Sequence, residues 1–276
     1  MNAYVTLVMN KIHYSKGALA MAHSLKLTNT KFPVICMITP DILMYRDMLL
    51  KVFDDIIIVP YLKYATDKLS TYKQNNIYNS WKDISFTKWN CLKLPYDKVC
   101  FLDADLIIKK NIDHLFDLPA PAGCFGNNWS SQVKYYDDIK HGEPIKEYVL
   151  NSGLLDGYVV NGHCVILEPS EYIFNEFMSF MSSGMYKKNK KCLSMTDEVA
   201  LVKFLASKKK QWTQIGRSYN CIPWKTNINV YIYHFFNKKK AWQMNRDEWP
   251  DLGIWYNVWD SMCKKYAITN ALLLKN

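Results

Sequence analysis

The chain has 276 residues, a net charge of +10 and an apolar content of 49%. Its length and composition allow a large packed core, and no window reaches the roughly 18 uninterrupted apolar residues that a membrane-spanning helix requires. The positive charge lies in short lysine runs, and arginine, the residue that reads guanine edges, is scarce. We therefore expect no membrane span and no nucleic-acid partner, and the charge fits an anionic substrate.

Strands and helices alternate along the first hundred residues. Apolar and β-branched runs predict strands at residues 3–9, 33–38, 55–59 and 98–102. Helices are expected between them, one through Ala18 and Leu25, one from Pro40 to about Phe53, and a short one over residues 86–94. Residues 63–83 predict an irregular loop region. This alternation is typical of an α/β fold with a mainly parallel, Rossmann-like sheet flanked by helices.

The second part of the chain follows this pattern less regularly. Strands are predicted at residues 122–126 and 158–167, and helices at residues 170–181 and 197–206. The remaining C-terminal region is rich in aromatic residues and is expected to be irregular, with its rings in the core rather than on a sugar-binding platform. Nothing resembles an interdomain linker or a repeat, so we predict a single domain over residues 1–276.

The eight cysteines are widely scattered, and several lie inside apolar runs. They predict buried, reduced thiols rather than disulfides or a zinc site. The N-terminal residues enter a strand pattern at once, without the basic region and small-residue cleavage site of a secretory signal. We therefore expect a cytoplasmic protein.

A pair of carboxylates follows the fourth predicted strand. Asp103 and Asp105 come directly after Val99–Leu102, and the carboxyl end of a strand in an open α/β sheet faces the ligand crevice. Such a pair can bridge a divalent cation to a phosphate-bearing substrate, although aspartate is also common there as a turn or cap residue. No glycine-rich phosphate loop occurs, so a diphosphate would need a metal and cationic side chains instead.

Two further candidates lie far along the chain. His234 ends an apolar, strand-like run, and Lys240 follows it closely. Mn²⁺ accepts an imidazole together with carboxylate oxygens, so His234 is a candidate third ligand, and Lys240 could hold a diphosphate as a point charge. Taken alone, a histidine beside an apolar run is more often a core or surface residue, and a lysine run is more often solvated.

Several motifs follow one another in a definite order. They are Tyr4–Leu7 with Tyr14–Leu19, Thr87–Cys91, Phe101–Asp105, Asn111–Phe116, Val160–Gly162 with Val165–Ser170, Thr196–Glu198, and His234 through Trp242. In this order they resemble the glycogenin-like glycosyltransferases of the retaining family 8, over most of the chain. The resemblance implies a GT-A-type glycosyltransferase domain, with a nucleotide-binding half at about residues 1–118 and a sugar and acceptor half at about residues 119–276. Glycogenin-like proteins are also encoded by large insect viruses, in which case the location would be the host cytoplasm.

Carried over residue by residue, the resemblance implies a complete donor site. Mn²⁺, or Mg²⁺ in its place, would bind Asp103, Asp105 and His234. A UDP-hexose donor would be lined by Thr6, Leu7, Asn10, Tyr14, Lys88, Ala104, Asn161, Gly162, Asp197, Glu198, Asn237 and Lys240. Asp197, Asn161 and Lys240 are the residues implied in catalysis, with Asp197 near the transferred sugar and Lys240 at the departing UDP. Asp113 is implied as a helix cap and Trp242 as a packing residue.

Departures from the family pattern leave the hexose open. Glu198 stands where the family commonly has glutamine, and Asn237 where it commonly has glycine near the phosphate. Glucose is favoured and galactose is the alternative. The segment between Asn220 and His234 is shorter than the glycogenin segment that carries the self-glucosylated tyrosine, so self-glucosylation is not carried over.

The resemblance implies a metal-dependent retaining hexosyltransferase that moves the hexose of a UDP-sugar to an acceptor hydroxyl. The acceptor, which is a glycan, a small molecule or a protein, stays open, as do the linkage, a covalent intermediate and a homodimer. The alternative is a catalytically silent protein that keeps the sugar-nucleotide fold and binds a glycan or a protein. The enzyme is favoured because both carboxylates, His234 and Lys240 are all in position.

Overall fold

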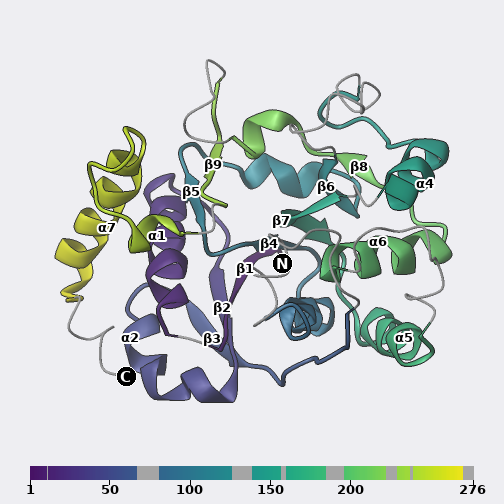
Figure 1. Cartoon of the computed structure of the whole chain (residues 1–276), viewed down its shortest axis with the longest axis horizontal. Helices are drawn as coiled ribbons and strands as arrows, with labels where there is room; N and C mark the ends of the chain where they lie inside the picture. Colours follow the sequence, from purple (N-terminus) through teal and green to yellow (C-terminus); the bar gives the residue numbers. More distant parts are fainter. Residues whose placement is uncertain are drawn as a thin grey trace. The chain divides into compact units, whose positions relative to one another are not determined.

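The computed structural model describes residues 1–10, 12–66, 81–125, 139–156, 160–184, 196–221, 229–236 and 239–269 (Figure 1). The chain forms two compact units, each built from separate segments. The first unit comprises Met1–Val59, Leu102–Leu115 and Arg217–Asn276, and the second comprises Pro60–Phe101 and Phe116–Gly216. Most of the predicted loop region at residues 63–83 lies outside the described residues, as do Asn237 and Cys192. A single domain with halves that meet near residue 118 stays a prediction.

The first unit contains the parallel strands predicted for the N-terminal part. Strand β1 (Ala3–Val8) pairs in parallel with β2 (Val34–Ile38), and β2 pairs in parallel with β3 (Asp55–Ile58). Nearly every residue of β1 and β2 is buried, which explains why both strands read as continuous apolar runs rather than as alternating patterns. Strands β5 (Leu106–Ile108) and β9 (Ile232–His234) form a separate antiparallel pair.

Helix α1 (Tyr14–Leu27) packs on β1 and β5. Ser24 Oγ accepts a hydrogen bond from the backbone N–H of Ile108 at 2.9 Å and donates one to the carbonyl oxygen of Met21 at 2.7 Å. This hydroxyl satisfies a buried amide of β5 that would otherwise lack a partner inside the unit. Helix α1 therefore positions β5, and the antiparallel pairing of β5 then positions the end of β9.

The helix predicted from Pro40 to about Phe53 is wrong in its form. The structure has a 3₁₀ turn, η1 (Pro40–Tyr45), followed by one turn of α-helix, α2 (Arg46–Leu49). Within these two elements only Ile42 and Leu49 are buried. A helix with so narrow an apolar face gains little from packing, and helices this short are marginal without it. The short helix expected near residues 86–94 is a buried 3₁₀ helix, η2 (Ser85–Lys93).

The C-terminal region is more regular than expected. Helix α7 (Leu252–Tyr266) lies beside α1 (Figure 1) and buries Leu252, Trp255, Trp259 and Met262. These positions are three or four residues apart, so they share one helix face. No side chain caps the N-terminus of α7, and the packing of its apolar face on α1 supplies the stability that a local start signal does not. The prediction that the aromatic rings belong to the core is confirmed here, since Trp255 stacks on Trp259 with ring centroids 5.5 Å apart.

The second unit contains the other predicted strands and helices, within one to three residues of the expected ends. Strand β6 (Ala122–Phe125) pairs antiparallel with β7 (Val160–Leu167) and parallel with β8 (Thr213–Gln214). The predicted helices are α5 (Glu171–Ser182) and α6 (Asp197–Ser207), and the structure adds α4 (Glu147–Asp156), which was not predicted. Helix α6 packs on β7, and its first turn is capped by Thr196, whose Oγ1 accepts a hydrogen bond from the backbone N–H of Val199 at 3.4 Å. Strand β4 (Val99–Leu102) is entirely buried.

The cysteines of the described ranges are free thiols, and all of them except Cys263 are buried. Burial raises the pKa of Cys91 to about 12, so this thiol stays protonated at neutral pH. The prediction of buried thiols without disulfides is confirmed for the described cysteines other than Cys263, which is partly exposed. No helix among the described residues has the length and apolar character that crossing a membrane would need.

Acid is expected to destabilise the first unit through His23. This side chain is fully buried between α1 and α7, with Nε2 at 3.1 Å from Ser261 Oγ and the ring edge-on to Tyr266. Burial, with Lys265 nearby, lowers the pKa of His23 from 6.5 to about 4. The unfolded chain therefore binds more protons between pH 6.5 and 4. The contribution of His23 to stability is complete above pH 6.5 and falls by on the order of 3 kcal/mol as the pH drops to 4.

Urea unfolding at several pH values from 7 to 4 measures this loss. The His23→Gln variant is the control, because glutamine does not titrate. We expect the free energy of unfolding of the wild type to fall faster with acid than that of the variant. Parallel pH profiles for the two proteins would contradict the role of His23.

Candidate active site

The acidic pair belongs to the first unit and lies in the turn between β4 and β5. Asp105 is buried, and Asp103 is partly exposed. The antiparallel pairing of β5 with β9 places Leu106 opposite His234, and the backbone N–H of Phe235 donates to the carbonyl oxygen of Asp105 at 2.9 Å. The strand register therefore brings His234 beside Asp105, although the two residues are distant in the sequence.

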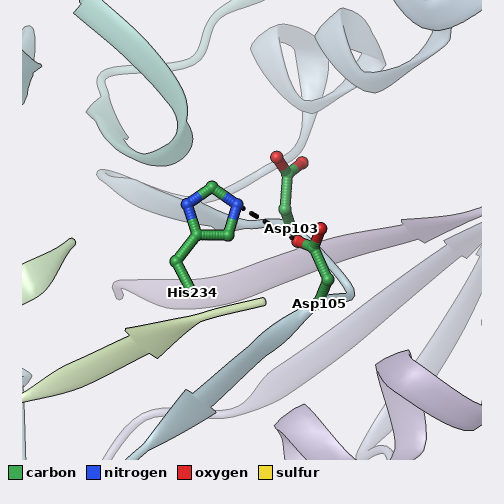
Figure 2. Close-up of side chains that lie close together, drawn as sticks. All are labelled: Asp103, Asp105 and His234. Atoms are coloured by element: carbon green, nitrogen blue, oxygen red, sulfur yellow. Dashed lines mark ion pairs between the residues drawn. The ribbon is translucent and has the colours of Figure 1, made fainter. Parts of the chain in front are cut away.

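Asp103, Asp105 and His234 form a three-residue cluster, with their side chains close together (Figure 2). Each offers one ligand atom, and these atoms lie within 4.8 Å of one another. His234 Nε2 is 3.5 Å from Asp105 Oδ1, a buried oxygen that accepts no hydrogen bond from the described residues. A buried carboxylate oxygen without a donor is costly, and a divalent cation would satisfy it. Two carboxylates and one imidazole are a donor set that suits Mn²⁺, and the residues thus fit the implied metal.

Lys240 binds the other oxygen of the same carboxylate. Its Nζ lies 2.6 Å from Asp105 Oδ2. Burial alone would raise the pKa of Asp105, but the positive charge and the hydrogen bond of Lys240, with His234 nearby, outweigh it and hold that pKa well below its usual range. Burial lowers the pKa of Lys240, and the contact with Asp105 more than reverses this effect. At neutral pH the pair is therefore a carboxylate and an ammonium, and Oδ1 stays available to a cation.

A close approach around Gly17 holds the Lys240 segment in place. Trp242 is buried next to Gly17, where an added Cβ would lie only 2.3 Å from the indole ring and 2.5 Å from the carbonyl oxygen of Ala104. Only glycine lets α1, the indole and the turn between the two aspartates meet. The packing role expected for Trp242 is confirmed. The turn η8 (Ala241–Gln243) follows, with Gln243 Oε1 accepting from the backbone N–H of Lys240 at 2.9 Å.

The predicted nucleotide contacts lie at the end of β1 and the start of α1. Thr6 is fully buried, and Leu7 is partly buried. Asn10 is exposed and has φ 64°, a left-handed conformation that asparagine tolerates better than most residues. The ring of Tyr14 lies edge-on to Trp242, with centroids 5.7 Å apart, which places it next to the segment that carries Lys240. Contact of these residues with a nucleotide stays a prediction.

The second unit holds a separate buried ion pair. Lys88 Nζ lies 2.6 Å from Asp197 Oδ2, and the two residues are 9% and 5% exposed. Trp89 Nε1 donates a hydrogen bond to the carbonyl oxygen of Asp197 at 3.0 Å, and Lys88 Nζ lies 5.0 Å from the centre of the Trp89 ring. Asp197 is also in the first turn of α6, where the helix dipole stabilises a negative charge.

Gly162 allows a second carboxylate to lie beside this ion pair. Glu198 Oε1 accepts a hydrogen bond from the backbone N–H of Gly162 at 2.8 Å. A Cβ on Gly162 would lie 2.8 Å from Glu198 Cγ and 2.8 Å from Lys88 Nζ, so the missing side chain makes room for both. The structure thus brings together four residues of the predicted donor site, namely Lys88, Gly162, Asp197 and Glu198. Asn161 is partly exposed in β7, and Asn237 lies outside the described residues.

Two contacts differ from or go beyond the sequence analysis. Asp113 was expected as a helix cap, but its Oδ1 accepts hydrogen bonds from Tyr4 and Thr30, at 2.8 and 2.6 Å. It joins β1 to the loop after α1, which corrects the prediction.

The sequence analysis missed Asn220, whose Oδ1 lies 2.9 Å from His234 Nδ1. No sequence motif marks an asparagine of this kind.

Comparison with known proteins gives relatives that cover the chain to different extents. No protein-family model matches it. The chain is 30% identical over 287 residues to uncharacterized protein R707 of Acanthamoeba polyphaga mimivirus, covering 95% of this chain and 94% of that protein. It is 32% identical over 153 residues to Glycogenin-1 of Homo sapiens, covering 50% of this chain and 42% of that protein. The chain therefore matches less than half of the length of this glycogenin.

A solved structure supports the fold. The galactosyltransferase LgtC, determined in complex with donor and acceptor sugar analogues, matches 95% of this chain and 96% of its own chain with a TM-score of 0.57 and 13% identity. The protein has a GT-A-type α/β fold, as predicted. The cluster of Asp103, Asp105 and His234 fits the Asp-x-Asp metal motif of such enzymes. The chain belongs to the glycogenin-like glycosyltransferases of the retaining family 8.

Proposed function

We propose that the protein is a metal-dependent retaining hexosyltransferase that moves the hexose of a UDP-sugar to an acceptor hydroxyl. The observation that supports this most directly is the cluster of Asp103, Asp105 and His234, with a buried carboxylate oxygen that lacks a hydrogen bond. Glucose is the favoured hexose because the ordered motifs resemble those of glycogenin. Galactose is the alternative, and the name of LgtC as a galactosyltransferase keeps it open.

The first unit would stabilise the leaving group. Asp103, Asp105 and His234 would hold Mn²⁺, or Mg²⁺ in its place, and the bound cation would supply positive charge for the departing UDP. Lys240, whose ammonium pairs with Oδ2 of Asp105, would add a second positive charge next to the departing UDP. As the bond from the anomeric carbon to UDP breaks, its electron pair would leave with the UDP oxygen. The acceptor oxygen would then form the new bond with net retention of configuration, and the proton of its hydroxyl would pass to the departing UDP.

The second unit would bind the transferred sugar. Lys88, Gly162, Asp197 and Glu198 are gathered there, and Asn161 lies next to Gly162 in β7. Asp197 would orient the hexose hydroxyls and stabilise the positive charge that develops at the anomeric carbon in an oxocarbenium-like transition state. Its pairing with Lys88 neutralises this buried carboxylate in the free protein.

The setting of the reaction is part of the same proposal. Buried thiols without disulfides, over the described ranges, are typical of a reducing compartment, which supports the cytoplasm. The acceptor would be a glycan or another compound that presents a hydroxyl group.

A panel of donors tests the proposal. The release of UDP from UDP-glucose, UDP-galactose and UDP-N-acetylglucosamine is measured with Mn²⁺, with Mg²⁺ and with EDTA. Water can slowly replace the unknown acceptor, so UDP release is measurable without one. We expect this release to require the metal and to be fastest with UDP-glucose. Binding of UDP without turnover of any donor would favour the catalytically silent protein, and metal-independent turnover would overturn the metal site.

A further inference from the structure

One polar side chain outside the predicted donor site contacts the imidazole of His234. Asn220 Oδ1 lies 2.9 Å from His234 Nδ1. An amide oxygen can only accept a hydrogen bond, so the proton of this contact belongs to Nδ1. With the proton on Nδ1, the neutral ring has its lone pair on Nε2. That nitrogen is the one that faces Asp105 Oδ1, at 3.5 Å.

The backbone holds Asn220 in register with His234. Asn220 follows the 3₁₀ turn η6 (Arg217–Tyr219), and the next residue, Cys221, forms an isolated parallel bridge with Tyr233. The backbone N–H of His234 donates to the carbonyl oxygen of Cys221 at 2.8 Å, and the N–H of Cys221 donates to the carbonyl oxygen of Ile232 at 3.0 Å. These backbone hydrogen bonds on both sides of Tyr233 therefore fix the distance between the side-chain amide of Asn220 and the imidazole of His234.

Burial makes this contact matter for the ring. The side chain of His234 is only 8% exposed, so water has little access to it. A buried N–H without an acceptor is unfavourable, and the ring would then turn or move its proton to Nε2. A protonated Nε2 cannot coordinate a metal, because its lone pair is used by the proton.

We propose that Asn220 is a positioning residue that holds His234 as the tautomer with its proton on Nδ1, so that the lone pair of Nε2 can coordinate the metal. The inference rests on the metal role proposed above for His234 and extends it beyond the three ligands. Residues that accept a hydrogen bond from the second nitrogen of a ligating histidine fix its tautomer and orientation, and their loss typically weakens metal binding by about 10- to 100-fold.

Measuring the Mn²⁺ dissociation constant from the EPR signal of free Mn²⁺ tests the inference without an activity assay. We expect Asn220→Ala to bind Mn²⁺ about 10- to 100-fold more weakly than the wild type. Asn220→Asp keeps an acceptor for Nδ1 and is expected to bind at least as tightly as the wild type. Ser218→Ala is the matched control, since this residue of the same segment contributes a backbone carbonyl oxygen to the pairing with Tyr231. Equal affinities for Asn220→Ala and the control would overturn the inference.

The tautomer itself is read by NMR on metal-free protein with ¹⁵N-labelled histidine. The wild type is expected to show His234 protonated on Nδ1, and Asn220→Ala a mixture or the other tautomer. A wild-type ring protonated on Nε2 would overturn the inference even if the variants do not fold. If the wild type shows the expected tautomer but binds no Mn²⁺, the proposed metal site fails and the positioning contact stands.

Discussion

Asp103→Asn is expected to lower metal-supported UDP release by at least about 100-fold while the variant unfolds in urea almost as the wild type does. The amide has the shape of the carboxylate but no charge, so it would hold a divalent cation poorly. Because Asp103 is partly exposed, water can solvate the amide that replaces its carboxylate. Steady-state UDP release and urea unfolding, measured on the same preparation, check both parts of the prediction.

Two comparisons make this result specific. Asp105→Asn is expected to lose as much metal-supported UDP release as Asp103→Asn. It is also expected to have a lower free energy of unfolding, because the largely buried ammonium of Lys240 would lose its carboxylate partner. Asp117→Asn, at an exposed aspartate of the turn η3 (Asp113–Asp117), is expected to behave as the wild type. If Asp103→Asn kept metal-supported turnover, the carboxylates would not be the metal site.

Lys88→Met is expected to lower the free energy of unfolding by about 3–5 kcal/mol, the usual cost of leaving one charge of a buried pair alone. Asp197 is 5% exposed, and its contact with Lys88 is 2.6 Å long. Methionine fills a similar volume next to Trp89 but supplies no charge. Urea unfolding of the variant measures the loss.

A double variant separates stability from catalysis. Lys88→Met with Asp197→Asn removes both charges and is expected to recover most of the lost stability, while it transfers no hexose. Lys208→Met is the matched control, because its partner Glu176 is about one-third exposed and surface ion pairs contribute little. If Lys88→Met were no less stable than Lys208→Met, the buried pair would not support the second unit.

The sequence analysis predicted most of the strands because they are short, apolar and buried on both faces, so each one carries its own signal. The turn with Asp103 and Asp105 was predicted because it directly follows β4, one of these apolar strands. Helix α7 was missed because its stability comes from packing Trp255 and Trp259 on the rest of the first unit rather than from a cap. The helix after Pro40 was overextended, because local propensity suggested more helix than its narrow buried face supports.

The candidate site was likewise predicted in part from the sequence and completed only by the structure. The residue types and their order along the chain were sufficient to identify Asp103, Asp105, His234 and Lys240 as a set, because the chemistry of a metal and a diphosphate restricts the side chains that can serve it. The sequence by itself determined the α/β class, the family and these candidate ligands. Only the tertiary structure decided that Lys240 binds Asp105, that Gly17 admits Trp242, and that Asn220 orients His234. Such contacts join residues far apart in the chain through strand register and close packing, and no local pattern of residues encodes them.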